Sequence, residues 1–277
     1  MRFPILRTVG VFLLMLSAVG CGHRGPSEAD LEQSMRETHL AASLREEGKI
    51  PAALERLEQA LALDPENADA LFLLGWMRYE ASHRAVSLDE RQRLLKDSAE
   101  RFRAGIASLV KYERTGAVLA EGHNMLGVVL IELGEYDEAM EVLRRSASDD
   151  MNTTPHLAWG NLGLAQLSAG EVDDAIQSLL QAISLQPRFC VGYERLGRAY
   201  FTKGELEQAE EALIRATTAD ESCTNNPWLQ GAYRLRGEVR ARLGRPEEAL
   251  GDFTRCVELG THTSHGRVCQ EFLDAVN

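Results

Sequence analysis

Two cysteines and two histidines near the end of the chain have a spacing that fits metal or thiol chemistry. Cys256, His262, His265 and Cys269 follow one another within one short segment. Two thiolates and two imidazoles form a ligand set that zinc accepts. The two cysteines can also bond to each other, which an oxidising compartment favours. We therefore predict a Cys256–Cys269 disulfide and no metal site.

Two further cysteines, Cys190 and Cys223, precede this segment. The chain has five cysteines, and setting Cys21 aside leaves an even number, as expected when the rest form disulfides. We predict a second bridge between Cys190 and Cys223, although the sequence leaves the alternative pairings open. The chain contains no nucleophile elbow, phosphate-binding loop or HExxH helix. We expect no catalytic residues, no cofactor and no small-molecule substrate.

The N-terminus has the pattern of a secretion signal. Arg2 and Arg7 give it a positive start, and an apolar run from Val9 to Val19 is too short to span a bilayer as a stable helix. The run ends in LSAVGC, which resembles a bacterial lipobox. This resemblance implies that Cys21 carries a diacylglycerol anchor. The alternative is an ordinary secretion signal with an unmodified cysteine.

The lipobox resemblance also implies where the chain goes. Gly22 follows the cysteine instead of Asp, which in bacterial lipoproteins implies sorting to the outer membrane. We expect a signal peptide over 1–20, an acylated tether over 21–30, and a protein held on the periplasmic face of the outer membrane. Two or three acyl chains would anchor it stably, because each buried methylene contributes about 0.8 kcal/mol.

The composition points to an all-α protein with protein partners. Aromatic residues are 6% of the chain, and no strand-like run of β-branched residues occurs. The formal net charge is −12. Nucleic acid is therefore excluded as a partner, because phosphate binding requires a basic surface.

The stretch from Thr154 to Pro187 has the pattern of two helices that meet at Gly170. Thr154 and Pro155 are typical of a helix start, where the hydroxyl can cap free N–H groups. Large apolar residues alternate with small ones at helical spacing, so the two helices can pack closely. The pattern is that of a tetratricopeptide repeat of 34 residues. Its core positions are Trp159, Leu162, Gly163, Ala175, Leu179 and Ala182.

The same unit recurs along the chain. The small residue at its eighth position is found at Ala41, Gly75, Gly127, Gly163, Gly197 and Gly237. We predict a right-handed superhelical solenoid of about six tetratricopeptide repeats over 31–260, closed by a capping helix over 261–277. Residues expected on the inner face of that helix are Val268, Phe272, Leu273 and Val276.

The second repeat is longer than the others. Apolar residues keep helical spacing through the additional residues, so we expect extended helices there and not a long loop. A basic cluster lies in this region, interleaved with acidic residues, which is typical of a solvated and ion-paired helix face. A contact with acidic lipid or an acidic partner is the alternative. The cluster comprises Arg91, Arg93, Lys96, Arg101 and Arg103.

In tetratricopeptide arrays the first helices of the repeats line the concave side. Here their groove positions are apolar, which differs from the Lys/Asn/Arg clamp for acidic tails. We predict an apolar trough that binds an extended or amphipathic peptide. Packing of these side chains between repeats is the alternative for each position. The predicted groove residues are Phe72, Trp76, Tyr79, Val128, Ile131, Leu157, Leu164, Leu167, Val191 and Phe201.

A lipobox, about six repeats and a closing helix together resemble a known group. The segments TPHLAWGNLGLAQLSAG and THTSHGRVCQEFL look like the type IV pilus biogenesis lipoproteins. This resemblance implies a pilotin, which binds outer-membrane secretin subunits and promotes their assembly. The alternative is a general envelope scaffold for peptidoglycan or outer-membrane assembly enzymes.

Overall fold

The computed structural model describes residues 25–224 and 226–275, and within these ranges all regular structure is helical. The predicted signal peptide, Cys21 and Val276 lie outside the described residues. No helix in the described ranges combines the length and the apolarity that crossing a membrane requires. The helices are α1 (Glu28–Glu46), α2 (Ile50–Leu63), α3 (Ala68–Ser82), α4 (Leu88–Lys111), α5 (Ala117–Leu133), α6 (Tyr136–Ala147), α7 (Pro155–Ala169), α8 (Val172–Leu185), α9 (Cys190–Lys203), α10 (Leu206–Thr218), α11 (Glu221–Thr224), the 3₁₀ helix η1 (Pro227–Leu229), α12 (Gln230–Arg242), α13 (Pro246–Leu259) and α14 (Ser264–Asp274).

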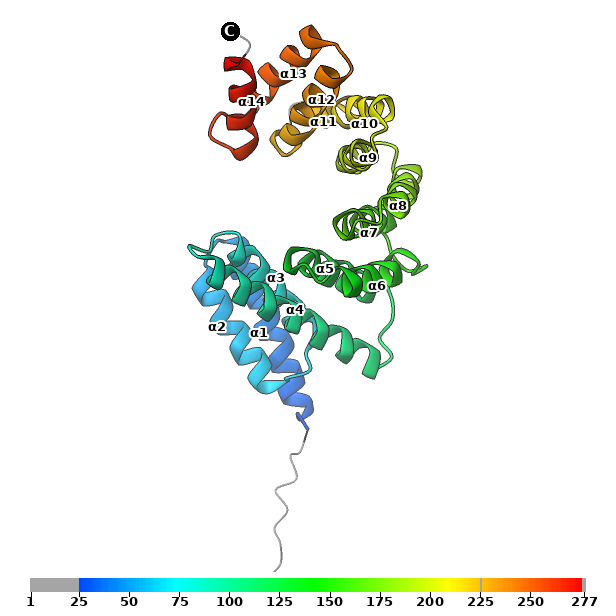
Figure 1. Cartoon of the computed structure of the whole chain (residues 1–277). Coiled ribbons are helices and arrows are strands. Elements are labelled where there is room, and N and C mark those ends of the chain that lie inside the picture. The colour runs from blue at the N-terminus through cyan, green and yellow to red at the C-terminus, as the bar shows by residue number, and fades with distance from the viewer. Residues whose placement is uncertain (1–24, 225, 276–277) are drawn as a thin grey trace, which may run out of the picture.

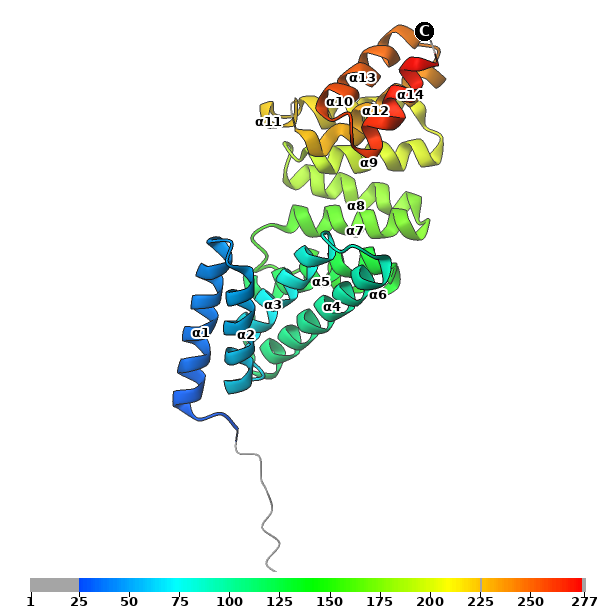
Figure 2. The same cartoon turned by 90° about the vertical axis from the view of Figure 1, so that its left-hand side faces the viewer.

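The helices pack in antiparallel pairs, and successive pairs stack on one another. The pairs are α1/α2, α3/α4, α5/α6, α7/α8, α9/α10 and α12/α13. The stack curves into an open C, and α5, α7, α9 and α12 lie on its inside (Figure 1). From the side, α1 and α2 run nearly vertically, while α7 lies nearly horizontally (Figure 2). The predicted all-α repeat array is confirmed.

Close helix packing explains the eighth-position glycines. A Cβ atom built on Gly163 would lie 2.6 Å from Leu179 Cγ, which is closer than Cβ contacts allow. The leucine, which is 0% exposed, therefore fills the space above the glycine. The equivalent partners of Gly127, Gly197 and Gly237 are Leu143, Leu213 and Phe253.

The ends of α7 are set by local chemistry. Pro155 is its first residue, as predicted, but the Thr154 side chain makes no capping hydrogen bond. Instead, the Thr154 N–H donates to the Asn152 side chain at 2.8 Å. At the other end Gly170 has a φ of 87°, the left-handed conformation that glycine adopts without strain.

The additional residues of the second repeat lie in one helix. α4 has 24 residues, while α3 has an ordinary 15. The prediction of extended helices is therefore right for the second helix and wrong for the first. Acidic residues pair with the basic cluster there, as in the 3.0 Å contact of Arg101 with Asp97. A second example is the 2.7 Å contact of Arg103 with Glu138.

Candidate peptide-binding groove

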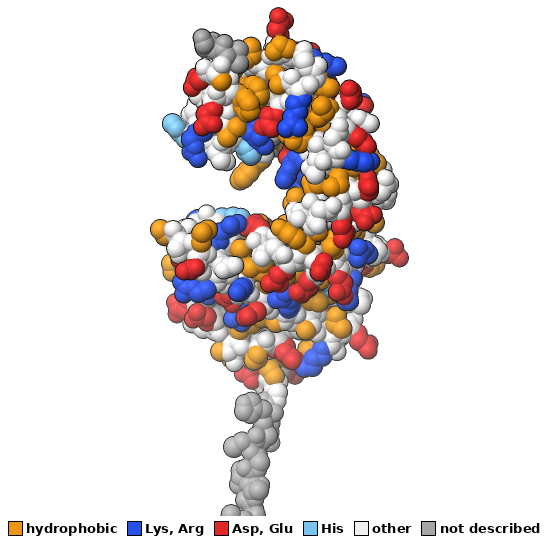
Figure 3. Space-filling model, viewed as in Figure 1, with side chains coloured by type: hydrophobic (Ala, Val, Ile, Leu, Met, Phe, Trp, Pro, Cys, Tyr) orange, Lys and Arg blue, Asp and Glu red, His pale blue; other side chains and the backbone are white. Residues whose placement is uncertain are grey.

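The concave face of the array is lined by α3, α5, α7, α9 and α12, with α14 at the far rim (Figure 1), and Arg45 of α1 reaches its first pocket. The hollow between the two arms is open to solvent and is edged by both hydrophobic and charged side chains (Figure 3). This face is where the predicted groove residues were expected.

All ten predicted groove residues are partly buried. Seven of them pack against the buried clusters between helices, so packing between repeats accounts for much of their surface. The other three, Val128, Leu157 and Leu164, belong to no such cluster. Those that pack against the core are Phe72, Trp76, Tyr79, Ile131, Leu167, Val191 and Phe201.

An apolar pocket of about 440 Å³ lies on this face between α1, α3 and α5. Phe72 and Trp76 line it together with Met125. The guanidinium of Arg45 lies 5.9 Å from the centre of the Trp76 ring and pairs with Glu80 at 2.8 Å. The pocket therefore has apolar walls and two charged side chains, Arg45 and Glu121, in its lining. The remaining lining residues are Leu73, Phe102, Val118 and Gly122.

Two glycines make room for the ring that forms one wall of this pocket. A Cβ atom on Gly105 would lie 2.5 Å from the Phe72 ring, and one on Gly122 would lie 2.7 Å from it. The ring is thus wedged between α4 and α5. Any larger residue at either glycine would displace Phe72 and reshape the pocket.

Tyr79 is tied to the third repeat. Its hydroxyl donates to Glu132 Oε1 at 2.8 Å, and Arg91 donates to the other oxygen at 2.7 Å. Burial, together with the hydrogen bond to Glu132, raises the pKa of Tyr79 well above its usual value. The phenol therefore stays protonated, and its hydroxyl is already engaged within the chain.

A row of polar side chains crosses the middle of the groove. The Asn161 amide donates to Asn124 Oδ1 at 2.9 Å, and Arg195 Nη1 donates to Asn161 Oδ1 at 2.9 Å. Leu157 and Leu164 lie on the same helix as Asn161. This part of the groove therefore combines apolar contacts with polar groups.

A second pocket, of about 430 Å³, lies between α9, α12 and α14, and it is charged. Arg234 Nε donates to His265 Nδ1 at 3.2 Å, and Arg234 also pairs with Glu238. Glu194 lies 3.9 Å from the guanidinium of Arg198. The rest of the lining is Phe201, Thr202, Gly231 and Leu235.

Burial shifts the pKa values of three side chains at this charged end. It raises the pKa of Glu194, against the opposing effect of the nearby arginines. It lowers the pKa of Arg195 to about 10. The pKa of His265 falls because of burial and then because of Arg234 and Arg198. A neutral His265 can accept the hydrogen bond from Arg234.

The apolar trough stays a prediction for the residues from Phe72 to Phe201, and beyond them the C-terminal end of the groove is charged. Glu194 and Arg234 stand at the same repeat position as Phe72, counted from the eighth-position glycine. The predicted groove set contains only apolar residues at these positions. Counting the same positions from Gly197 and Gly237 would have found the charged ones.

Both cysteine pairs are joined by disulfides. The Cα atoms are 5.8 Å apart for Cys190–Cys223 and 6.2 Å apart for Cys256–Cys269. The sulfur atoms of Cys256 and Cys269 bond to each other, so they do not serve as thiolate ligands for zinc. Across the described ranges, no group of three or more His, Cys, Asp or Glu residues is placed to hold a metal ion.

The second disulfide fastens α14 to α13. Gly266 allows the close approach, because a Cβ atom there would lie 1.8 Å from the carbonyl oxygen of Gly260. The rings of Phe272 and Phe253 stack with centres 4.5 Å apart. The helix thus covers the end of the last pair and brings His265 to the rim of the groove.

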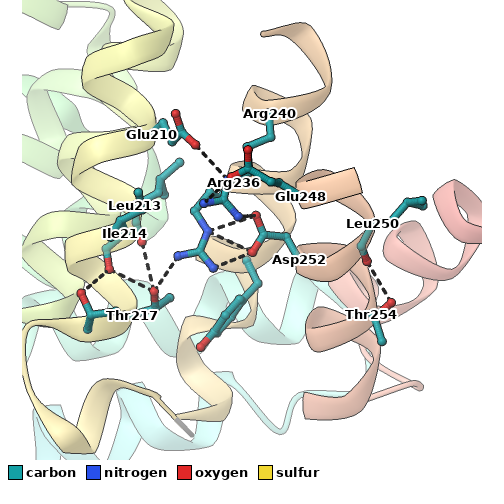
Figure 4. Close-up of polar contacts among 12 residues, drawn as sticks. Glu210, Leu213, Ile214, Thr217, Arg236, Arg240, Glu248, Leu250, Asp252 and Thr254 are labelled. Atoms are coloured by element: carbon teal, nitrogen blue, oxygen red, sulfur yellow. Dashed lines mark hydrogen bonds and ion pairs between the residues drawn. The ribbon is translucent and has the colours of Figure 1, made fainter. Parts of the chain in front are cut away.

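A buried network of ion pairs joins the last two repeats (Figure 4). The Arg236 guanidinium donates to both oxygens of Asp252, with Nε at 3.0 Å from each, and to Thr217 Oγ1 at 2.8 Å. Arg240 bridges Asp252 at 3.0 Å and Glu210 at 2.9 Å. Asp252 is only 3% exposed. The network therefore fixes α10, α12 and α13 relative to one another.

Acid should weaken this network. Burial acts to raise the pKa of Glu210, but hydrogen bonds from Arg240 and Arg245 outweigh it and hold the pKa below its usual value. A lowered pKa gives stability that is present above the unfolded-state value and is lost as the pH falls through the folded-state value. We expect urea unfolding to show falling stability below about pH 4.5. Glu210→Gln should reduce that slope, whereas an unchanged slope would contradict the assignment.

Comparison with known families and structures supports the repeat architecture. One protein-family model, described as TPR repeat, matches residues 42–80. Another family model, described as tetratricopeptide repeat, matches residues 125–188 and 194–260. The crystal structure of PilW, described as a widely conserved type IV pilus biogenesis factor, is similar with a TM-score of 0.68 and 19% identity. That similarity covers 85% of this chain and 97% of PilW.

Two further similarities are informative. The structure of Pseudomonas aeruginosa pilF gives a TM-score of 0.64 at 18% identity, over 88% of this chain and 99% of pilF. The heat shock protein STI1 of Saccharomyces cerevisiae is 24% identical over 48% of this chain and 22% of its own length. The chain spans less than half the length of the curated relatives it matches. At these identities the structural similarities show the fold. The chain is a tetratricopeptide-repeat protein.

Proposed function

We propose that this protein is a lipid-anchored scaffold of the outer membrane that acts as a pilotin for type IV pilus biogenesis. In this role it binds secretin subunits and promotes their assembly, without an enzymatic step. The observation that carries the proposal is the concave groove with its apolar pocket at Trp76. The near-complete overlap with PilW and pilF supports it. So do two disulfides, which fit a compartment outside the cytoplasm.

The proposed mechanism follows from anchoring and shape. Acyl chains on Cys21 hold the solenoid at the inner leaflet of the outer membrane. The groove captures an amphipathic segment of an unassembled secretin subunit. Capture raises the local concentration of subunits at the membrane and covers strand edges that would otherwise aggregate. Ring assembly is then favoured over aggregation.

The anchor is tested by Cys21→Ala. The variant should leave the membrane fraction almost completely and secretin multimers should fall, because the acyl chains that hold the protein are absent. Fractionation and immunoblotting of multimers measure both effects. Gly25→Ala is a matched control in the same tether, since a Cβ atom there meets nothing within 4 Å. Full membrane association of Cys21→Ala would overturn the anchor.

The partner is tested by crosslinking in intact envelopes followed by pull-down of the protein. We expect secretin subunits to be recovered with the wild-type chain. Recovery of peptidoglycan or outer-membrane assembly enzymes without secretin would replace the pilotin role with a general scaffold role.

A further inference from the structure

We infer that the groove selects one kind of segment: extended, with large apolar side chains at one end and two acidic side chains about eight residues away. This inference rests on the proposed groove-binding function, and it adds the chemistry and the spacing of the ligand. Its basis is the difference between the two ends of the groove, where one pocket is apolar and the other is charged.

The charged end contains cations that the chain itself does not neutralise well. The nearest carboxylate to Arg198 is Glu194 at 3.9 Å, and the side chain of Arg198 is 48% exposed. The Arg242 guanidinium lies 4.4 Å from the centre of the Phe201 ring. In the described ranges Arg242 has no carboxylate partner. Two separate guanidinium groups therefore lie at this end, Arg198 in the pocket lining and Arg242 against the Phe201 ring.

The charge balance around this pocket favours an acidic ligand. Arg198 and Arg234 line it together with Glu194 and Glu238, and Arg242, which lies against the ring of the lining residue Phe201, adds a third arginine. Glu238 already pairs with Arg234. The local excess is positive, although the chain as a whole carries −12. Two carboxylate side chains satisfy Arg198 and Arg242 separately, which a single terminal carboxylate does not.

The distance between the two ends sets the spacing in the ligand. The apolar pocket lies between α3 and α5, and the charged pocket lies between α9 and α12. Three helix-to-helix steps separate them, at about 8–10 Å each. An extended chain covers about 3.3 Å per residue, so about seven to nine residues span the gap.

The middle of the groove suits the main chain of such a segment. Asn161 and Arg195, which are only partly buried, present amide and guanidinium groups there, and the buried Asn124 holds Asn161 in place. A peptide that lies in the groove loses water from its N–H and C=O groups, which then need other partners. These side chains provide hydrogen-bond partners for the peptide main chain, whatever the sequence of the peptide.

The ligand chemistry is tested with fluorescein-labelled synthetic peptides and fluorescence anisotropy. The reference peptide has a Leu-Phe-Leu end, eight Gly and Ser residues, two Glu residues and an amidated C-terminus. We expect it to bind about tenfold more tightly than the same peptide with two Gln residues, or with a spacer of three residues. Equal affinities, or no binding by any peptide, would overturn the inference. Binding only by a peptide with a free terminal carboxylate and no Glu would also overturn it.

The arginines are tested by the double variant Arg198→Gln/Arg242→Gln. It should lose about tenfold in affinity for the Glu peptide and nothing for the Gln peptide. Arg144→Gln, at an exposed arginine of α6 that lines neither pocket, is the matched control and should bind both peptides as the wild type does. If the Gln peptide binds and the double variant changes nothing, the acidic specificity fails while groove binding stands. If secretin is absent from the pull-down but the peptides discriminate, the pilotin role fails and this specificity stands.

Discussion

Asp252→Ala should lower the free energy of unfolding by about 3–5 kcal/mol, because it leaves the buried Arg236 charge without its partner. The same change removes one of the three carboxylates that Arg240 contacts. Urea unfolding followed by circular dichroism measures the loss.

Two controls separate the buried charge from a simple loss of volume. Glu248→Ala removes an exposed carboxylate that lies 3.4 Å from Arg240, and it should cost no more than about 1 kcal/mol. The double variant Arg236→Met/Asp252→Leu replaces the pair by apolar groups and should recover most of the stability. A loss below about 1 kcal/mol for Asp252→Ala would show that water solvates the arginine after all.

Trp76→Asp should weaken binding of the partner segment by about 2–4 kcal/mol, or roughly 30- to 1000-fold. Trp76 lines the apolar pocket, and an ionised carboxylate there would have to lose water when the segment binds. Titration of the purified protein with the reference peptide, which carries the Leu-Phe-Leu end, measures the change. Crosslinked recovery of secretin should fall in parallel.

A second pair of variants distinguishes a loss of binding from a loss of folding. Trp76 also packs against a buried cluster, whereas Val118 lines the same pocket and is 46% exposed. Val118→Asp should therefore weaken binding with little effect on stability. Val110→Asp changes a valine that is 59% exposed and lies outside both pockets, so it should bind normally. Equal binding by Val118→Asp and Val110→Asp would mean that this pocket is not used.

Much of the fold was predictable because repeats encode local packing. The pair formed by Gly163 and Leu179 has equivalents at the same spacing in other repeats. In the structure each of these leucines packs over its glycine. The length of α4 was predictable for the same reason, since its apolar spacing is continuous. These features depend on contacts within one repeat, which periodicity reports directly.

Features that depend on contacts between repeats were not predictable. The Tyr79 hydroxyl is engaged by Glu132 of the next repeat, and no spacing rule indicates that pair. The close approach of Gly266 to the carbonyl of Gly260 depends on how the chain turns after α13. The charged residues of the second pocket follow from their repeat positions, but the contact of Arg234 with His265 of α14 does not. Such contacts depend on how one helix pair packs against the next.

The placement of the two disulfides affects how the chain carries mechanical load. In a stack where each pair contacts only its neighbours, tension applied at the N-terminal end opens pairs in succession. Within α9 to α11 the pulling force passes through the Cys190–Cys223 bond, so the 33-residue separation it spans is shielded from extension. The Cys256–Cys269 bond shields a further separation of 13 residues. Under tension the apolar end of the groove can therefore extend as its helices unfold. At the charged end the two disulfides limit how far the chain can extend.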